Sequence, residues 1–516
     1  MKLFVENIFL NLIKKIEYKN ILLIFNSMES SSFLIVHKKY GSFDKFEGAK
    51  SANKCLLFDK VIYTDTSCSL LERADYPLFV GVLQTTGPKY GYTSRQHPIY
   101  LCKPLDSKYP PFYIGSKIKD NLHNKLITFK FDKWEEKKEF PSGTFLALLG
   151  VCGNIEAEKQ ASFILASPYK WSKIIPEIII PSFKNRMKLS GFTFNIDPDG
   201  CKDIDDCITI CDNSIAISIA DVSAFVQVNP WMKFAEKIGT SLYQNNKCVK
   251  PMFPRILSED KMSLVIGEER LAYSLIITFT DTIYWSFKET IVKVDKSYTY
   301  ESIFNDNTIY TPSIKNMIYR LSGIETNDSH KWIEILMLYY NSKAGEVLNN
   351  KNKGIMRSQK GINLERAKLF EKFGSDYMYL SYESAKYCFP SDNTTHQQLE
   401  IQCYAHASSP IRRYVDIINQ FALKDKEFTY EVLERFNIQQ KDAKEYEREL
   451  LYIDLYQNKK VLDGVVLDGE KIFIPYLKKI IKLNNVLEIS KKVQLKYYIN
   501  PNSFKWKDKI IFALDM

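Results

Sequence analysis

The sequence predicts a multidomain α+β protein in which small antiparallel barrels come first, a large mixed α/β core follows, and a short β module ends the chain. Its 516 residues exceed the roughly 250–300 that one hydrophobic core usually supports. Hydrophobic residues make up 45% and charged residues 26%, as is typical of packed globular domains. Short apolar runs broken by Gly, Pro, Ser and Asn dominate at first, and helical patterns appear beyond residue 313.

Changes in this pattern of apolar residues divide the chain into segments. Short strands at close spacing favour small barrels over α/β units in the first third. Apolar residues recur at i, i+3 and i+4 in 332–348 and 432–456, which predicts amphipathic helices in the core. The expected divisions are an N-terminal segment, a first barrel, a second barrel, the core and the C-terminal module, at residues 1–30, 31–98, 99–170, 171–455 and 456–516.

Composition narrows the class of protein only loosely. The net charge of +10 fits a nucleic-acid binder with a basic channel, and equally fits many proteins without such a partner. The ten cysteines show no C-x-x-C pair or zinc-finger spacing, so we expect free thiols in a reducing compartment. No apolar run reaches the roughly 18 residues of a membrane helix, so we expect a cytoplasmic protein without membrane contact. Lys, Asn, Ile and Tyr usage is typical of an AT-rich genome, such as that of a parasite or a large virus.

An acidic segment between residues 194 and 207 is the strongest chemical signal. Its aspartates are Asp197, Asp199, Asp203, Asp205 and Asp206. Pro198 and Gly200 predict a turn that brings the carboxylates together. Two charges about 4 Å apart repel by ~4 kcal/mol at an effective dielectric near 20, so such a cluster favours a bound cation. Oxygen ligands suit Mg²⁺, with Mn²⁺ as the alternative, and such ions serve phosphodiester hydrolysis. A solvated acidic turn or a structural calcium loop remains open from these residues alone.

This segment, Ile196-Asp-Pro-Asp-Gly-Cys-Lys-Asp-Ile-Asp-Asp206, resembles the metal-binding signature of the RNase II/RNase R (RNB) family, especially its form in the catalytic subunit of the eukaryotic exosome. Further blocks that resemble the family follow in order, at 219–223, 239–272 and 404–416. The resemblance implies an RNB catalytic core flanked by N-terminal cold-shock-type OB barrels and a C-terminal OB-like RNA-binding module. The N-terminal endonuclease domain of exosome subunits is not expected, because only about thirty residues precede the first barrel.

The resemblance also implies roles for particular residues. Four aspartates match the family's magnesium ligands: Asp197, Asp203, Asp205 and Asp206. Asp205 matches the one required for chemistry, and Arg412 matches an arginine that holds a phosphate near the scissile bond. The implied RNA-binding residues are Tyr243, Tyr300, Arg412, Arg413 and Glu447. By sequence alone, such tyrosines are more often ordinary packing residues, and the two arginines could equally be salt-bridged helix residues. His406 is expected to be structural.

Three departures from the family's pattern bear on substrate contacts. Glu334-Ile335 stands ahead of Met337 where the family has two adjacent glutamates. His396-Gln-Gln-Leu399 replaces a histidine-aromatic-glycine-leucine sequence, and Gln420 stands where a histidine is common.

The function implied is magnesium-dependent 3′→5′ hydrolysis of single-stranded RNA to nucleoside 5′-monophosphates. The chain would act as a monomer, or with exosome-like or other RNA-processing partners. The alternative is a catalytically inactive RNA-binding or scaffold protein of the same fold. Such a protein is expected to have lost at least one of the four metal-site aspartates, and all four are present here.

Overall fold

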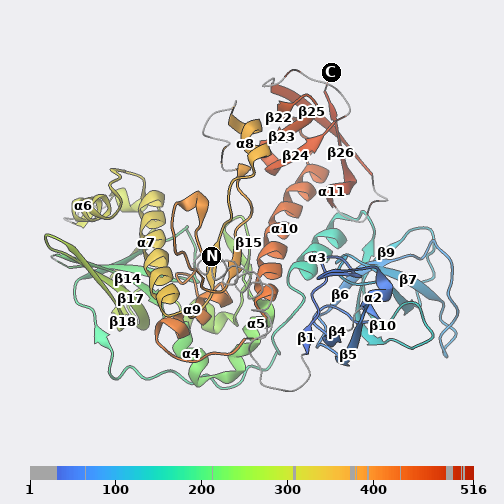
Figure 1. Ribbon diagram of the computed structural model, residues 1–516, viewed down its shortest axis with the longest axis horizontal. Coiled ribbons are helices and arrows are strands. Elements are labelled where there is room, and N and C mark those ends of the chain that lie inside the picture. Colours follow the sequence, from blue (N-terminus) through green and yellow to red (C-terminus); the bar gives the residue numbers. More distant parts are fainter. Residues whose placement is uncertain are drawn as a thin grey trace, which may run out of the picture. The chain divides into compact units, whose positions relative to one another are not determined.

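The computed structural model divides into two compact units, one ending at Cys152 and the other beginning at Gly153 (Figure 1). The structure describes residues 32–63, 66–211, 213–305, 310–371, 378, 380–391, 394–430, 432–483, 488, 492–500, 503 and 506–515. The predicted N-terminal segment, residues 1–30, lies outside the described residues. Each unit is described separately below.

The first unit holds a small sheet and a closed barrel. The sheet has the order β1-β4-β5, with β1 at Phe33–Leu34, β4 at Lys60–Tyr63 and β5 at Cys68–Glu72. Beside it are the hairpin β2 (Ser42–Phe43) and β3 (Phe46–Glu47) and the short helix α2 (Ala49–Ala52). The barrel has the order β10-β8-β7-β6-β9, with strands at Phe79–Leu83, Ile99–Pro104, Phe112–Gly115, Lys125–Lys133 and Ser142–Val151 for β6 to β10. It is the expected OB barrel.

Strand β6 shows where pairing differs from the expected segmentation. Sequence analysis assigned Phe79–Leu83 to the first barrel, but β6 pairs with β7 and β9 in the same closed barrel, with Gly81 opposite Pro104 and Phe79 opposite Phe129. The physical reason is that an apolar run identifies a strand and not its partners. The domain limits drawn from the sequence stay a prediction.

A seven-stranded sheet forms the centre of the second unit. Its order is β11-β18-β17-β14-β13-β12-β19. The strands lie at Met187–Lys188 (β11), Phe192–Ile196 (β12), Asp206–Cys211 (β13), Ser214–Ala220 (β14), Glu269–Phe279 (β17), Ile283–Lys293 (β18) and Lys296–Tyr298 (β19). Side chains alternate along β14, so Ile215, Ile217 and Ile219 pack in one buried cluster with Trp332 and Leu336 of α7 (Ser329–Asn350). Figure 1 shows α7 beside these strands, and α6 (Tyr310–Ser322) packs against α7.

A second buried cluster holds the helices that frame the candidate site. It joins residues of α4 (Val222–Val228), α5 (Ala235–Ile238) and α9 (Tyr414–Leu423), and every residue of α9 is buried. Two small antiparallel sheets complete this part, the hairpin β15 (Leu242–Gln244) with β16 (Lys247–Lys250) and the pair β20 (Met356–Ser358) with β21 (Lys386–Cys388). The long helix α10 (Leu433–Gln457) follows α9. The helices predicted at 332–348 and 432–456 are therefore confirmed within α7 and α10.

The C-terminal module is a five-stranded antiparallel sheet in the order β24-β23-β22-β25-β26. Its strands are β22 (Leu462–Asp468), β23 (Lys471–Ile474), β24 (Lys479–Lys482), β25 (Lys492–Ile499) and β26 (Ile510–Leu514), with α8 (Leu364–Glu371) and α11 (Trp506–Lys509) beside it. Lys509 of α11 forms a buried ion pair with Glu158 of α3 (Ile155–Ala166). The expected OB-like β module is confirmed. None of the described helices combines the length and apolarity needed to cross a membrane.

Candidate functional site

The acidic segment forms the loop between β12 and β13, two neighbouring antiparallel strands. The backbone N–H of Asp197 donates to the carbonyl of Tyr298 at 3.0 Å, which fixes the loop's start at the edge of the sheet. Gly200 has φ +75°, the left-handed region that glycine adopts without strain, and the loop turns there as predicted. Since both strand ends meet at one edge, the loop gathers carboxylates that lie up to nine positions apart.

Asp205 is the buried centre of this loop, with 5% of its surface exposed. Its carboxylate accepts hydrogen bonds from the backbone N–H of Ile411 at 2.8 Å and from Nε of Arg412 at 3.3 Å. Burial raises the pKa of Asp205 to about 8, although Arg412 and the Ile411 N–H both favour its ionised form. The contact joins the acidic loop to the turn before α9, and so brings Asp205 and Arg412 together.

Asp203 meets Tyr243, which lies forty residues further on in the hairpin strand β15. The Tyr243 hydroxyl donates to the Asp203 carboxylate. Burial and then the charge of Asp203 raise the pKa of Tyr243 far above its ordinary value, so the phenol stays protonated and the donor is retained. This contact holds the half-buried Tyr243 ring beside the acidic loop.

Asp197 and Asp206 carry the electrostatic signature of a cation site. Burial and then the neighbouring carboxylates Asp205 and Asp203 raise the pKa of Asp197 to about 7. Burial and then Asp197 raise the pKa of Asp206 to about 7. Oδ2 of Asp197 is buried without a hydrogen-bond partner. An unsatisfied oxygen among mutually repelling carboxylates fits a divalent cation, which prefers such hard ligands.

The carboxylates do not form a ready-made coordination sphere. In the part of the chain that the structure describes, no three His, Cys, Asp or Glu side chains are grouped as a metal site. The reason lies in the contacts above, because Tyr243 engages Asp203 and Arg412 engages Asp205. A metal site of the four aspartates therefore stays a prediction.

Tyr300 also lies near the acidic loop. Burial and then the charges of Asp197 and Asp206 raise the pKa of its hydroxyl to about 12. Its ring stacks on His330, with centroids 3.8 Å apart and planes 8° from parallel. The hydroxyl of Ser329, at the start of α7, donates to the Tyr300 carbonyl at 2.6 Å. Packing therefore fixes this ring, and its predicted contact with RNA stays a prediction.

The remaining predicted residues have different surroundings. Arg413 is mostly buried and donates to Asp416 at 2.9 Å, while its Nε is buried without a partner. Glu447 lies on an exposed face of α10. His406 accepts or donates a 2.9 Å hydrogen bond with Tyr387, and burial together with nearby arginines lowers its pKa well below the ordinary value. That environment fits the structural role expected for His406, and the RNA contacts of Arg413 and Glu447 stay predictions.

Main-chain contacts join the hairpin that carries Tyr243 to the turn that carries Arg412. The Ser241 N–H donates to the Arg412 carbonyl at 2.9 Å, and the Tyr414 N–H donates to the Gly239 carbonyl at 2.9 Å. Gly239 has φ +76°, and a Cβ there would lie 2.0 Å from the Gln439 side-chain oxygen. The left-handed φ favours glycine here, and any other side chain would also have to displace the end of Gln439.

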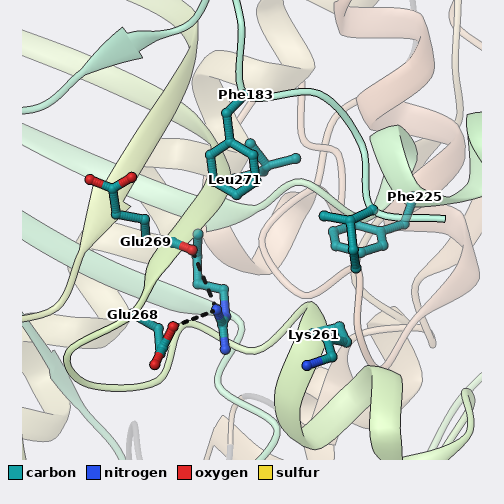
Figure 2. A pocket seen from close by; sticks show the side chains of 8 residues that line it. Phe183, Phe225, Lys261, Glu268, Glu269 and Leu271 are labelled. Atoms are coloured by element: carbon teal, nitrogen blue, oxygen red, sulfur yellow. Dashed lines mark hydrogen bonds and ion pairs between the residues drawn. The ribbon is translucent and has the colours of Figure 1, made fainter. Parts of the chain in front are cut away.

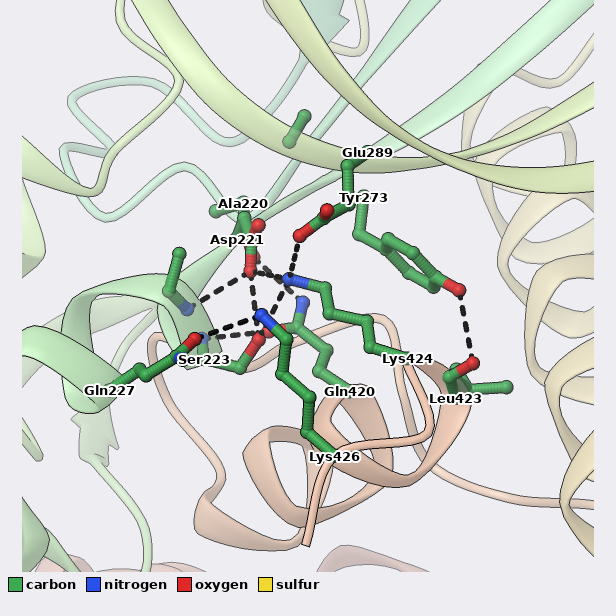
Figure 3. A network of polar contacts seen from close by, with 12 residues as sticks. Ala220, Asp221, Ser223, Gln227, Tyr273, Glu289, Gln420, Leu423, Lys424 and Lys426 are labelled. Carbon is green, nitrogen blue, oxygen red and sulfur yellow. Dashed lines mark hydrogen bonds and ion pairs between the residues drawn. The ribbon is translucent and has the colours of Figure 1, made fainter. Parts of the chain in front are cut away.

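A buried network of polar contacts around Asp221 was not predicted from the sequence (Figure 3). The fully buried Asp221 carboxylate accepts from Arg186 at 2.6 Å, from Lys424, and from the Ala224 N–H at the start of α4. Burial opposes its ionisation, but Lys424 and Arg186 outweigh burial and hold the pKa of Asp221 well below its usual range. The signal was present as Asp221 within the block at 219–223 that resembles the family, but a single aspartate in such a block does not reveal its distant partners.

Gln420, where the family commonly has a histidine, belongs to the same region. Its Nε2 donates to the Ala220 carbonyl at 2.8 Å, and its Oε1 accepts from the Ser223 N–H at 3.1 Å. This buried amide therefore ties α9 to the β14–α4 junction (Figure 3). The departure from the family's pattern affects packing here.

A cavity of about 280 Å³ lies in the second unit (Figure 2). Its lining consists of Ile180, Phe183, Phe225, Lys261, Glu268, Glu269, Arg270 and Leu271. Arg270 pairs with Asp260 at 3.1 Å and with Glu268 at 3.6 Å, so the charged rim is largely neutralised. None of the predicted site residues lines this cavity.

The architecture defines a multidomain protein with a mixed α/β core and OB-type β modules, and the acidic loop with its arginine defines a candidate phosphodiester-processing site. The RNB domain model matches residues 187–306 and 304–427, and the Dis3-like cold-shock domain 2 model matches residues 99–166. Together these stretches cover more than half of the chain. The chain belongs to the RNB family, which confirms the resemblance seen in the sequence.

Curated relatives agree over parts of their length. The chain is 28% identical over 252 residues to the exosome complex exonuclease RRP44 homolog A of Arabidopsis thaliana, a match that covers 44% of this chain and 26% of that protein. It is 28% identical over 415 residues to ribonuclease R of Helicobacter pylori, covering 61% of this chain and 64% of that protein. The chain thus spans between about a quarter and just under two thirds of these relatives.

Solved structures agree in fold. RNase R of Mycoplasma genitalium, in complex with ribose-methylated single-stranded RNA, superposes with a TM-score of 0.66 and 16% identity, covering 94% of this chain and all of that one. Yeast Ssd1, a pseudonuclease, superposes with a TM-score of 0.62 and 16% identity, covering 91% of this chain and 74% of that one. At these identities the likeness establishes the fold alone.

Proposed function

We propose that this chain is a 3′→5′ exoribonuclease that hydrolyses single-stranded RNA to nucleoside 5′-monophosphates, with Mg²⁺ or Mn²⁺ as cofactor. The observation that carries the proposal is the retained set of Asp197, Asp203, Asp205 and Asp206, gathered in one loop against Arg412 within an RNB core. A protein kept only for binding has no need to maintain carboxylates that repel one another and RNA. Its ligand is single-stranded RNA, and it acts in the cytoplasm, as a monomer or with exosome-like partners.

The chain's own residues suggest how the reaction is arranged. Water attacks the phosphorus of the last linkage, the bond from phosphorus to the 3′ oxygen breaks, and that oxygen takes a proton. A cation held by the aspartates would supply the charge that activates water and stabilises the leaving oxygen. Arg412 is 45% exposed at its side chain, and Asp205 engages only its Nε. Its two terminal nitrogens can therefore bind a phosphate as a fork, while Asp205 fixes the orientation.

The runner-up is a catalytically inactive RNA-binding protein. The likeness to Ssd1 favours it, because that pseudonuclease has the same fold. Activity separates the two candidates, since both would bind RNA.

A single-stranded RNA labelled at its 5′ end is expected to shorten to a short end product in Mg²⁺ and to remain intact in EDTA. A 3′-phosphate at the end of the strand is expected to slow the reaction, because attack begins there. Gel electrophoresis of a time course measures both results. Early release of the labelled 5′ nucleotide would contradict the polarity, and an intact strand in Mg²⁺ and in Mn²⁺ would favour the inactive binder.

Replacing Tyr243 by Ala is expected to weaken binding of single-stranded RNA by ~1–3 kcal/mol, because base stacking on the ring is lost. Tyr243→Phe keeps the ring and removes only the donor to Asp203, so it should retain most of the affinity. Fluorescence anisotropy at one salt concentration measures both variants. Tyr284→Ala, at an aromatic side chain 65% exposed in β18, is the matched control and should change nothing. Equal affinity of Tyr243→Ala and wild type would return Tyr243 to a packing role.

A further inference from the structure

Two cations, Arg357 on the two-stranded sheet β20–β21 and Lys444 on α10, lie in the region of Arg413 and His406. Arg357 belongs to β20, and its guanidinium lies over the ring of Tyr387 in β21, 4.7 Å from the ring centroid. Lys444 of α10 is near enough that Arg357 lowers its pKa, second only to partial burial. The charges of Arg357, Arg412 and Arg413 all contribute to lowering the pKa of His406. All three guanidinium groups therefore lie near enough to one imidazole to lower its pKa.

Among these arginines, Arg357 is the one whose positive charge no carboxylate of the described residues pairs with. The residue is 7% exposed, and among the described residues its guanidinium has neither a hydrogen-bond acceptor nor an ion-pair partner. Asp205 engages Arg412 and Asp416 engages Arg413, so both of those arginines have their own carboxylates. Burial of a charged group without a partner is costly, commonly by several kcal/mol. An anion that enters this cluster from solution would remove that cost.

The histidines nearby do not add to the positive charge, and two polar atoms of this region lack a hydrogen-bond partner. Burial and then Arg357 lower the pKa of His396 to about 4, so its ring is neutral near pH 7. Its Nδ1 is buried without a partner, and so is Nε of Arg413. These two unsatisfied atoms, from different segments of the chain, are a second indication that the cluster is built to surround a ligand.

We propose that Arg357 and Lys444 bind a phosphate of the RNA backbone next to the one held by Arg412. The guanidinium is planar and presents paired N–H donors that match phosphate oxygens, and the Tyr387 ring holds it in place. Lys444 adds a second charge from α10, the helix that also carries Glu447. This subsite rests on the proposed function in its choice of RNA as ligand, and it makes Arg357 a determinant of binding rather than a catalytic residue.

The test measures binding of a single-stranded RNA in EDTA, where the strand is not degraded, over a series of salt concentrations. Each phosphate contact to a single strand contributes about 0.7 to the slope of log affinity against log salt. Arg357→Gln and Lys444→Gln are therefore each expected to lower the slope by about 0.7. At low salt, the affinity should fall roughly tenfold for the loss of one charged hydrogen bond.

Arg320→Gln is the matched control, because its guanidinium also lies 4.7 Å from an aromatic centroid, that of Phe279, but donates to the Thr280 carbonyl. It should leave slope and affinity unchanged. Lys444 is at the surface of a helix, so its variant remains informative if Arg357→Gln melts at lower temperature. Unchanged slopes for both Arg357→Gln and Lys444→Gln, or an equal loss for Arg320→Gln, would overturn the subsite.

Methylphosphonate substitution, one linkage at a time, locates the phosphate. The wild type should lose affinity at a linkage where Arg357→Gln loses none. A parallel titration with adenosine 5′-monophosphate separates the backbone from a released nucleotide: affinity for the nucleotide that depends on Arg357, without any effect on RNA, would overturn the backbone assignment. These outcomes differ from failure of the proposed function, since an inactive chain can still show the predicted slopes. A wild type that binds no RNA would overturn both.

Discussion

Asp205→Asn is expected to lower RNA hydrolysis by roughly 10³-fold or more, the scale of losing one electrostatic contact to the transition state, while RNA affinity is retained. The amide has nearly the same shape and can still accept the Ile411 N–H that Asp205 accepts at 2.8 Å. What is lost is one negative charge at the proposed cation site and the ion pair that orients Arg412. Affinity should survive, because it depends on phosphate contacts and stacking along the strand.

Single-turnover degradation in Mg²⁺ and anisotropy at the same salt concentration measure these two quantities for Asp205→Asn. Asp199→Asn is the matched control, because Asp199 lies in the same loop and its side chain is exposed. It should keep activity close to that of the wild type. Near-normal hydrolysis by Asp205→Asn would falsify the metal-site proposal. Loss of affinity and activity together, with a lower melting temperature, would mean that Asp205 chiefly anchors the turn before α9.

Asp221→Asn is expected to reduce the free energy of unfolding by ~3–5 kcal/mol, the range seen when one partner of a buried ion pair is removed. Asp221 is fully buried, and the side chains of Arg186 and Lys424 are 7% and 3% exposed. The amide would leave both cations without their main counter-charge, and Glu289, 3.2 Å from each, is only partly buried. Urea unfolding at pH 7 measures the loss.

The pH dependence provides an independent check on Asp221. The two cations depress its pKa in the folded protein, so its stabilising contribution is present above the unfolded value near 3.9 and is lost as pH falls toward the folded value. The difference between wild type and Asp221→Asn should therefore shrink below about pH 4. Asp260→Asn removes a surface carboxylate, 40% exposed, that pairs with Arg270. It should cost less than about 1 kcal/mol, and an equal effect of the two variants would contradict the role given to Asp221.

Local sequence patterns predicted those parts of the structure that depend on neighbours in the chain. The helical spacing in 332–348 predicted α7, and the turn at Pro198 and Gly200 placed the carboxylates in one loop. Contacts between distant segments were beyond such patterns. The Asp205–Ile411 hydrogen bond spans 206 positions. Asp221 likewise pairs with Arg186 and Lys424, which come from segments far apart in the chain.

The same limit explains what was missed in the candidate site. The family resemblance pointed to Asp205 and Arg412, but it did not predict that the Tyr243 hydroxyl donates a hydrogen bond to Asp203. Arg357 was not singled out, because a lone arginine in a three-residue strand carries no periodic signal. Its significance depends on the absence of a carboxylate nearby among the described residues, which is a property of the fold.

The bridge between the Tyr243 hairpin and the Arg412 turn has a consequence for how this site can change over evolutionary time. The spacing between the aromatic ring and the guanidinium is set by amide–carbonyl pairs at Ser241–Arg412 and Tyr414–Gly239, which most residues at those positions could form. The main-chain pairing itself therefore requires no particular side chain at Ser241 or Tyr414, while Tyr243 and Arg412 supply the groups whose separation it sets. Sequence changes elsewhere in the two segments can therefore accumulate while the separation between the Tyr243 ring and the Arg412 guanidinium is kept.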